Sequence, residues 1–490
     1  MIKLLNTIFG IILITFSAEA QNRNSIWCFG DSAGIDFRNI SMPVPISTGM
    51  DSRGTCASIS DSLGSLLFYA YAAPDGTWPP NGKVYNANHQ IMLNGDSING
   101  AGMYDEMIII PKPGNSSIYY LFSVQITPFS PSGTFYSVVD MTGDGGLGEV
   151  ICKNNSVDID SLCGGMTTVR HGNGRDWWLI IKGYSALGDS TFYEYLITPD
   201  TMIQKVINVG GNSWAGLGNL CFNKEGNKIA FVSFAGLIET FDFDRCTGVF
   251  SNSRIIRRQF QNNSLQFFGA CFSPNSNLLY IADEMEVSRL FQLDLSSSNP
   301  FLNRDTLAVI TTSRYGGGNL RLAPDNKIYW SIEWDPGGTF PYPYQSHMYS
   351  QYNMNLSVIE NPDVVGAGCN LNLFSFYLGG KRTYWGLPNN PDYEMAPLWG
   401  SACDSLTNDI DKILENELII YPNRFTDIIY FNSPEKFKKV SVYNGFGQII
   451  LDKRLNEKNE LNLSEFSAGT YYLEFIYEKT VVRRKMIKMK

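Results

Sequence analysis

A short pattern of apolar and polar positions recurs along the first 390 residues of the chain. Each copy has an apolar residue, a polar turn rich in Pro, Gly, Asn or Asp, and then a short apolar run. A turn between two apolar runs predicts a β-hairpin, and a constant period predicts a repeat protein. Neighbouring copies lie 50 to 59 residues apart, and they open at Ile59, Ile110, Val169, Phe222, Phe272 and Leu322.

A second strand is predicted in five of these copies, and it ends 22 to 31 residues after the opening residue. Aromatic or aliphatic residues alternate there with polar ones, as in a strand with one buried face. Two hairpins in about 50 residues is the content of one β-propeller blade. The second strands are predicted at 135–140, 192–198, 240–244, 290–294 and 349–353.

The length of the repeated region sets the number of blades. Residues 21–390 divided by the mean spacing give seven units, so we predict a seven-bladed β-propeller, with six and eight blades as alternatives. The seventh unit is expected to use 372–377 and 383–386, and the N-terminal strand 26–29 is expected to close it. Such a closure removes the free edges that a linear array of sheets would expose.

Six segments of this region form a recognisable set. They are FGDSAGIDF at 29–37, CASISD at 56–61, NHQIM at 88–92, IIPKPG at 109–114, YSVVDM at 136–141 and GLPN at 386–389. This set resembles the N-terminal propeller region of large Bacteroidetes surface proteins associated with gliding motility. The resemblance covers most of residues 25–390 and implies a propeller at the cell surface. That family has no common set of catalytic residues, so no activity is implied.

The end of the chain has a different order of segments. An apolar strand runs into a turn, a second strand follows at 428–431, and further strands are predicted at 440–444 and 463–473 before a basic and apolar end. The residues that carry this pattern are Tyr421, Pro422, Asn423, Gly469, Tyr471, Lys485 and Lys488.

This order resembles the C-terminal sorting domain of the type IX secretion system of Bacteroidetes. The usual turn of that family is Tyr-Pro-Asn-Pro-Phe, and here Arg424 replaces the second proline. The resemblance implies that residues 416–490 form a small β-sandwich whose seven residues named above act as the sorting signal. It also implies that the secretion machinery and its sorting protease are partners, and that the body is anchored to surface lipopolysaccharide or released.

The N-terminus predicts a Sec signal peptide over residues 1–20. Lys3 supplies the positive charge, residues 4–16 are mostly apolar, and Ala-Glu-Ala at 18–20 offers a cleavage site. No apolar run reaches the length of a membrane-spanning helix. We therefore expect an exported protein without a transmembrane segment, either secreted or held at the outer-membrane surface. Residues 385–411 lose the period and are rich in Pro, Asn and Asp, so we expect residues 391–415 to link the propeller to the sorting domain.

Composition agrees with an all-β fold, because 45 Gly, 26 Tyr and 30 Phe are typical of short strands joined by tight turns. The net charge is −9, although residues 435–490 contain 12 Lys and Arg against 7 Asp and Glu. An acidic body argues against nucleic acid as a partner, since phosphates require a basic surface. The basic tail is expected either to meet an anionic surface or to protect a strand edge.

Nine cysteines in an exported chain allow disulfides and leave at least one thiol over. Cys152 and Cys163 are close enough in sequence to staple one loop. Only three histidines occur and no Cys-x-x-Cys pair, so we expect neither a zinc site nor any other cofactor.

Three motifs are candidates for chemistry. Residues 30–34 fit the G-x-S-x-G pattern of serine hydrolases around Ser32, but strand is predicted to follow where the motif requires a helix. Residues 74–78 are similar to a sialidase Asp-box but are one residue short, and the acidic, Gly-rich loop 140–149 lacks the order of known calcium loops. We expect all three to be turns, and therefore no catalytic or metal-binding residues.

These observations favour a non-enzymatic surface module that presents one propeller face to a glycan or protein ligand. The alternative is a propeller hydrolase or lyase that acts on extracellular polysaccharide. A deep pocket with carboxylates at one end of the channel would favour the enzyme, and a shallow face would favour binding.

Overall fold

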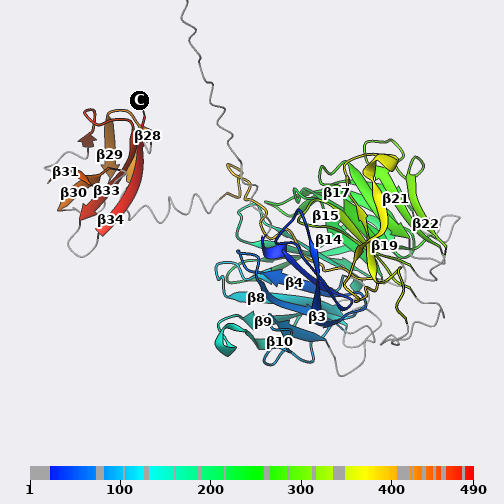
Figure 1. Cartoon of the computed structure of the whole chain (residues 1–490). Coiled ribbons are helices and arrows are strands. Elements are labelled where there is room, and N and C mark those ends of the chain that lie inside the picture. Colours follow the sequence, from blue (N-terminus) through cyan, green and yellow to red (C-terminus); the bar gives the residue numbers. More distant parts are fainter. Residues whose placement is uncertain are drawn as a thin grey trace, which may run out of the picture. The chain divides into compact units, whose positions relative to one another are not determined.

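The structure, a computed structural model, divides into two compact units, Met1–Cys403 and Asp404–Lys490 (Figure 1). The predicted signal peptide lies outside the described residues. Within the described part of the chain, no helix is long and apolar enough to cross a membrane. The described residues are 22–72, 82–102, 105–125, 132–158, 162–184, 189–213, 217–258, 265–283, 287–311, 316–334, 348–404, 419–421, 424–432, 438–444, 448–453, 460–476 and 481–489.

The first unit is an all-β propeller of seven antiparallel sheets, as predicted. The first two blades have three strands each in the described part, namely β1 (Ile26–Phe29), β2 (Asp31–Asp36), β3 (Val44–Asp51), β4 (Cys56–Ser60), β5 (Leu66–Tyr71) and β6 (Lys83–Asn86). Three short 3₁₀ helices accompany the described strands of this unit, η1 (Asn22–Asn24), η2 (Asp144–Gly146) and η3 (Gly366–Cys369).

The other five blades have four strands each. The third and fourth blades are β7 (Met107–Pro111), β8 (Ile118–Gln125), β9 (Gly133–Asp140), β10 (Glu149–Asp158), β11 (Leu162–Arg170), β12 (Trp177–Gly183), β13 (Asp189–Ile197) and β14 (Met202–Ser213). The last three are β15 (Gly218–Phe222), β16 (Lys228–Ser233), β17 (Ile238–Asp244), β18 (Val249–Arg257), β19 (Phe267–Phe272), β20 (Leu278–Asp283), β21 (Ser288–Asp294), β22 (Asp305–Ile310), β23 (Gly317–Leu322), β24 (Ile328–Ile332), β25 (Asn355–Ile359) and β26 (Leu371–Tyr377).

The predicted period matches the blades. All six opening residues lie in the first strand of a blade, at or near its end, and the predicted second strands at 135–140, 192–198, 240–244 and 290–294 overlap the third strands β9, β13, β17 and β21. The prediction for 349–353 is wrong, because the backbone there turns and β25 begins only at Asn355. The first strands β1, β4, β7, β11, β15, β19 and β23 follow one another around the central channel.

The predicted make-up of the seventh blade is also wrong. The strand β26 at 371–377 belongs to the blade that β23 begins, and β1 pairs with β2 to open a blade of its own. A local hairpin forms at a lower entropic cost than pairing with a distant strand, which explains this choice. The ring closes through aromatic contacts, in which Trp27 and Phe37 pack edge-on against Tyr329 with ring centres 5.8 and 5.5 Å away.

The second unit contains a three-stranded and a five-stranded sheet that share one apolar core, so the predicted small β-sandwich is present. Phe431 and Phe475, from different sheets, have ring centres 5.7 Å apart. The strands are β27 (Ile419–Tyr421), β28 (Arg424–Phe425), β29 (Ile428–Asn432), β30 (Lys439–Tyr443), β31 (Ile449–Lys453), β32 (Glu460–Asn462), β33 (Gly469–Ile476) and β34 (Val481–Lys488).

A carboxylate lies buried between the fourth and fifth blades. Glu239 of β17 is fully buried, and its Oε2 accepts a hydrogen bond from the backbone N–H of Gly211 in β14 at 2.7 Å. Burial raises the pKa of Glu239 to about 7, although this N–H and the charge of Lys182 act in the opposite direction.

We predict that Glu239 makes stability depend on pH. The folded state keeps the proton up to about pH 7 while the unfolded chain loses it near pH 4, so the free energy of unfolding should fall by up to about 3 kcal/mol between pH 4 and 8. Glu239→Gln should flatten this dependence in urea unfolding measured at several pH values. The control variant Asp200→Asn, at an exposed turn, should leave it unchanged. An unaltered pH profile in Glu239→Gln would contradict the assignment.

Candidate functional site

The segment after the last blade runs along the central channel. We call residues 385–403 the strap. Its backbone first bonds the last blade, where the carbonyl of Trp385 accepts from Asn319 N–H at 2.7 Å, and then the second blade, where Asn389 N–H donates to the carbonyl of Cys56 at 2.8 Å. These two blades flank the first blade in the ring, so the strap passes from one side of the first blade to the other.

The strap continues past the third and fourth blades. The Asn389 amide donates to the carbonyls of Met107 in β7 and Met166 in β11 at 3.2 and 2.9 Å. Tyr393, which is 1% exposed, donates its hydroxyl to the carbonyl of Ile109 at 3.0 Å. Leu398 N–H then bonds the carbonyl of Gly172 at 2.8 Å, in the first hairpin turn of the fourth blade.

Two features hold the strap in place. A side chain at Gly386 would put its Cβ 1.6 Å from the carbonyl oxygen of Gly54, so only glycine permits this approach. At the other end Cys403 forms a disulfide with Cys246 of the fifth blade. The linker predicted at 391–415 is therefore wrong for residues 391–403, which pack on the propeller. The predicted staple between Cys152 and Cys163 is also wrong, because Cys152 is a free thiol.

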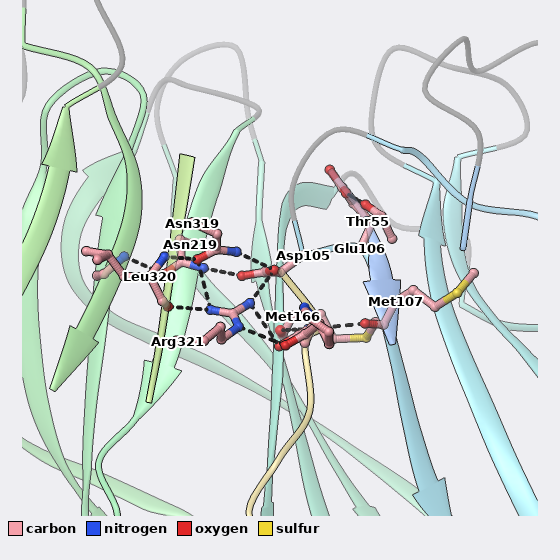
Figure 2. Close-up of polar contacts among 12 residues, drawn as sticks. Thr55, Asp105, Glu106, Met107, Met166, Asn219, Asn319, Leu320 and Arg321 are labelled. Carbon is pink, nitrogen blue, oxygen red and sulfur yellow. Dashed lines mark hydrogen bonds and ion pairs between the residues drawn. The ribbon is translucent and has the colours of Figure 1, made fainter. Parts of the chain in front are cut away.

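A buried carboxylate connects the inner strands beside the strap (Figure 2). Asp105, just before β7, is 1% exposed and accepts hydrogen bonds from the amide of Asn219 in β15, from that of Asn319 in β23 at 2.9 Å, and from Arg321 Nη2 at 2.5 Å. Three blades lie between β7 and β23 on one side of the ring and two on the other. The interaction thus spans the channel.

Arg321 ties this network to the strap. Its Nε donates to the carbonyl of Pro388 at 3.0 Å, and its Nη1 donates to the Asn319 amide oxygen at 3.0 Å. Burial alone would lower the pKa of Arg321, but the adjacent Asp105 carboxylate outweighs burial and raises it. The guanidinium therefore stays charged inside the propeller.

A cavity of about 380 Å³ lies between the strap and the inner strands. Strap residues Asn389 to Asp392, with Glu394 and Met395, contribute to one wall, and β11, β15, β19 and β23 contribute to the others. Lys224 Nζ donates to the amide oxygen of Asn326 at 2.8 Å, which joins the hairpin turns of the fifth and seventh blades beside the cavity. Polar wall residues include Asn24, Thr167, Thr168, Asn223, Lys224, Arg321, Asn326, Asn389, Asn390, Asp392 and Glu394.

Asp392 is a carboxyl of the cavity wall whose pKa lies above its usual value. Burial raises the pKa of its carboxyl, while the backbone N–H of Glu394, at 3.0 Å, and the charge of Lys224 partly offset that effect. In the described part of the chain, no three His, Cys, Asp or Glu side chains gather in a way that could hold a metal ion.

Two of the three motifs singled out from the sequence lie in the described part of the chain, and neither lines this cavity. Ser32 is in β2, with positive φ and its hydroxyl 3.4 Å from an Asp31 carboxylate oxygen, and no helix follows it. This is not the strand-turn-helix of a serine nucleophile. The loop 140–149 contains the short helix η2, and the Asp-box-like stretch 74–78 lies outside the described residues.

The predicted sorting residues lie in the second unit. Tyr421 ends β27, Gly469 and Tyr471 are in β33, and Lys485 and Lys488 are in β34. Lys488 is only 6% exposed; its Nζ donates to the carbonyl of Leu463 at 3.0 Å and lies 3.5 Å from the Asp427 carboxylate. The ammonium group of Lys488 thus bonds groups of its own unit. Pro422 and Asn423 lie outside the described residues.

The sequence analysis predicted neither the strap nor the hydrogen-bond network at Asp105, although the sequence contains an indication of each. The strap contains Trp385, Leu387, Tyr393 and Met395, which an exposed linker would not retain. The triplet Gly-Asn-Leu occurs at 218–220 and again at 318–320, and both asparagines bind Asp105.

A family model described as the secretion system C-terminal sorting domain matches residues 419–489. The tail unit is a type IX secretion sorting domain. Its presence implies export to the cell surface or the medium and contact with the secretion machinery. No curated protein matches the chain.

Solved structures resemble the chain at low identity. A Bacteroides fragilis protein provisionally assigned as a 6-phosphogluconolactonase has 11% identity and a TM-score of 0.47, covering 74% of this chain and 96% of its own. PorZ of Porphyromonas gingivalis, an essential surface component of the type IX system, has 11% identity and a TM-score of 0.35, covering 94% of this chain and 63% of its own. Nothing about activity follows from likenesses this distant.

We predict that Asp105→Asn lowers the free energy of unfolding by about 3–5 kcal/mol, because it leaves the buried Arg321 guanidinium without its counter-charge. Urea unfolding followed by tryptophan fluorescence measures the loss. Combining Asp105→Asn with Arg321→Met removes both charges, so the double variant should lose less than the sum of the single variants. Strictly additive losses would contradict a coupled pair.

Proposed function

We propose that this protein is a surface or secreted binding module, and that the cavity beside the strap holds its ligand. The observation that carries the proposal is the cavity itself, at a site where four inner strands and the strap converge. A concave site with a few convergent polar groups is the usual form of a ligand site. The sorting domain supports an extracellular ligand, because export delivers the propeller outside the cell.

The finer steps of export belong to the same proposal. The secretion machinery recognises the sorting domain, its protease removes that domain, and the propeller stays anchored to lipopolysaccharide or is released. In either case residues 391–403 remain with the propeller, since they lie on its side of the boundary at Cys403 and the disulfide to Cys246 holds them.

The hydrogen bonding of Asp105 supports binding over catalysis. Both oxygens of Asp105 already accept hydrogen bonds from Asn219, Asn319 and Arg321, so Asp105 is not available as a general base. A structural role accounts for all of its contacts.

An extracellular polysaccharide hydrolase or lyase is the second candidate, and Asp392 favours it. This carboxyl lines the cavity, and its burial keeps the proton to higher pH than usual, as a general acid requires. Degradation of a polysaccharide by the whole protein, abolished by Asp392→Asn, would establish the enzyme and displace the binding module.

Export gives one prediction. A chain that ends at Asp404 should fold but remain in the periplasm, because it lacks the signal that the machinery reads. Immunoblots of periplasmic, surface and medium fractions measure its location against the full chain. The truncated chain at the surface in normal amount would contradict a sorting role for the tail.

The cavity gives another prediction. Thermal-shift screening of the whole chain against a library of sugars, sugar acids, nucleotides and amino acids should yield at least one stabilising compound. Lys224→Trp adds bulk to the cavity wall and should weaken that compound at least tenfold. The control Lys205→Trp, on the outer strand β14, should not. A library without a single binder, or equal loss in both variants, would overturn the cavity as the ligand site.

A further inference from the structure

We infer that the cavity takes a neutral carbohydrate, a mono- or disaccharide unit presented by an extracellular glycan. The inference rests on the proposed function, which assigns the cavity a ligand without its chemical class. The cavity volume of about 380 Å³ is at the small end of the ~300–1,000 Å³ range of ligand pockets. A compact ring fits such a volume better than an extended chain.

The charges of the wall argue against an ionic ligand. Lys224 and Arg321 are balanced by Asp392 and Glu394, so the formal charge of the wall is zero. Arg321 is also paired with Asp105 at 2.5 Å. Recognition of a phosphate or carboxylate depends on cations free to form charge-assisted hydrogen bonds, and this wall has no surplus of them.

The remaining polar wall is uncharged. It is built from two threonines, Thr167 and Thr168, and from five asparagines, Asn24, Asn223, Asn326, Asn389 and Asn390. Part of it already bonds the protein, because the Asn389 amide donates to two backbone carbonyls and the side chains of Asn223 and Asn390 are bonded within the propeller. Amides and hydroxyls offer both donors and acceptors. Each hydroxyl of a sugar needs the same mixture, because it donates one hydrogen bond and accepts others.

Thr168 is a buried hydroxyl in need of a partner. It is 3% exposed, lies in the cavity wall, and its Oγ1 forms no hydrogen bond with any of the residues that the structure describes. Buried hydroxyls are normally satisfied, and leaving one unpaired destabilises the protein. The Oγ1 atom is closed off from the cavity in this rotamer, so a rotation about χ1 has to turn it toward the ligand. A ligand hydroxyl, unlike an ionised group, can then serve this threonine as either donor or acceptor.

The apolar part of the wall fits the other face of a sugar ring. Ile40, Leu220, Phe222, Leu322 and Pro391 line the cavity together with the polar groups. The C–H face of a pyranose can pack on such side chains while its hydroxyls reach the amides and threonines. A wall that combines apolar side chains with uncharged polar ones therefore matches a saccharide.

Isothermal titration of the whole chain tests this inference. The probes are glucose, galactose, mannose, N-acetylglucosamine and their β- and α-linked disaccharides, compared with glucuronate, glucose 6-phosphate and free amino acids. At least one neutral sugar should bind, and more tightly than its charged counterpart. Thr168→Val keeps the shape of the side chain and should weaken that sugar about tenfold, the effect of one lost hydrogen bond.

Thr134→Val is the matched control. Thr134 in β9 is equally buried and its hydroxyl also lacks a hydrogen bond in the described part of the chain, but it is not in the cavity wall. This variant should bind the sugar as the parent does, and thermal unfolding confirms that both variants fold. Tighter binding of charged probes at the same cavity would overturn the carbohydrate assignment while the proposed binding function stands. Absence of binding by every class of probe would overturn both.

Discussion

The carboxylate of Asp105 holds together inner strands that the sequence places far apart. Its partners on β23 are 214 and 216 residues away along the chain, and Asn219 is 114 residues away. A buried carboxylate without such partners would be costly, so the three donors must meet at this one point. The distance between opposite sides of the ring is thereby fixed.

The strap depends on the same network. Arg321 donates to the carbonyl of Pro388, and Asn389, the next strap residue, bonds carbonyls of the third and fourth blades. Both side chains also belong to the cavity wall. The shape of the cavity is therefore a property of the closed ring as a whole. Any change that shifts Asp105 alters the site through Arg321, even without contact with a ligand.

The predictable parts of this protein were those encoded locally. Turns such as those after Phe222, Phe272 and Leu322 repeat at a fixed interval, so the blades and most third strands follow from period and patterning. The first blade could not be predicted in this way, because its strands lack the repeated turn. The pairing of Cys246 with Cys403 was equally hidden, since nine cysteines allow many connectivities. Burial of the strap depends on a channel that exists only after all blades have formed.

The disulfide at Cys403 lies one residue before the tail unit begins at Asp404. A pull on the tail thus passes from Cys403 directly into the fifth blade through Cys246, and the force bypasses the hydrogen bonds that hold residues 385–402 in the channel. The disulfide bond, and not the hydrogen bonds of the strap, therefore carries the applied force. Force applied to the tail should therefore leave the positions of the strap and of the cavity wall unchanged.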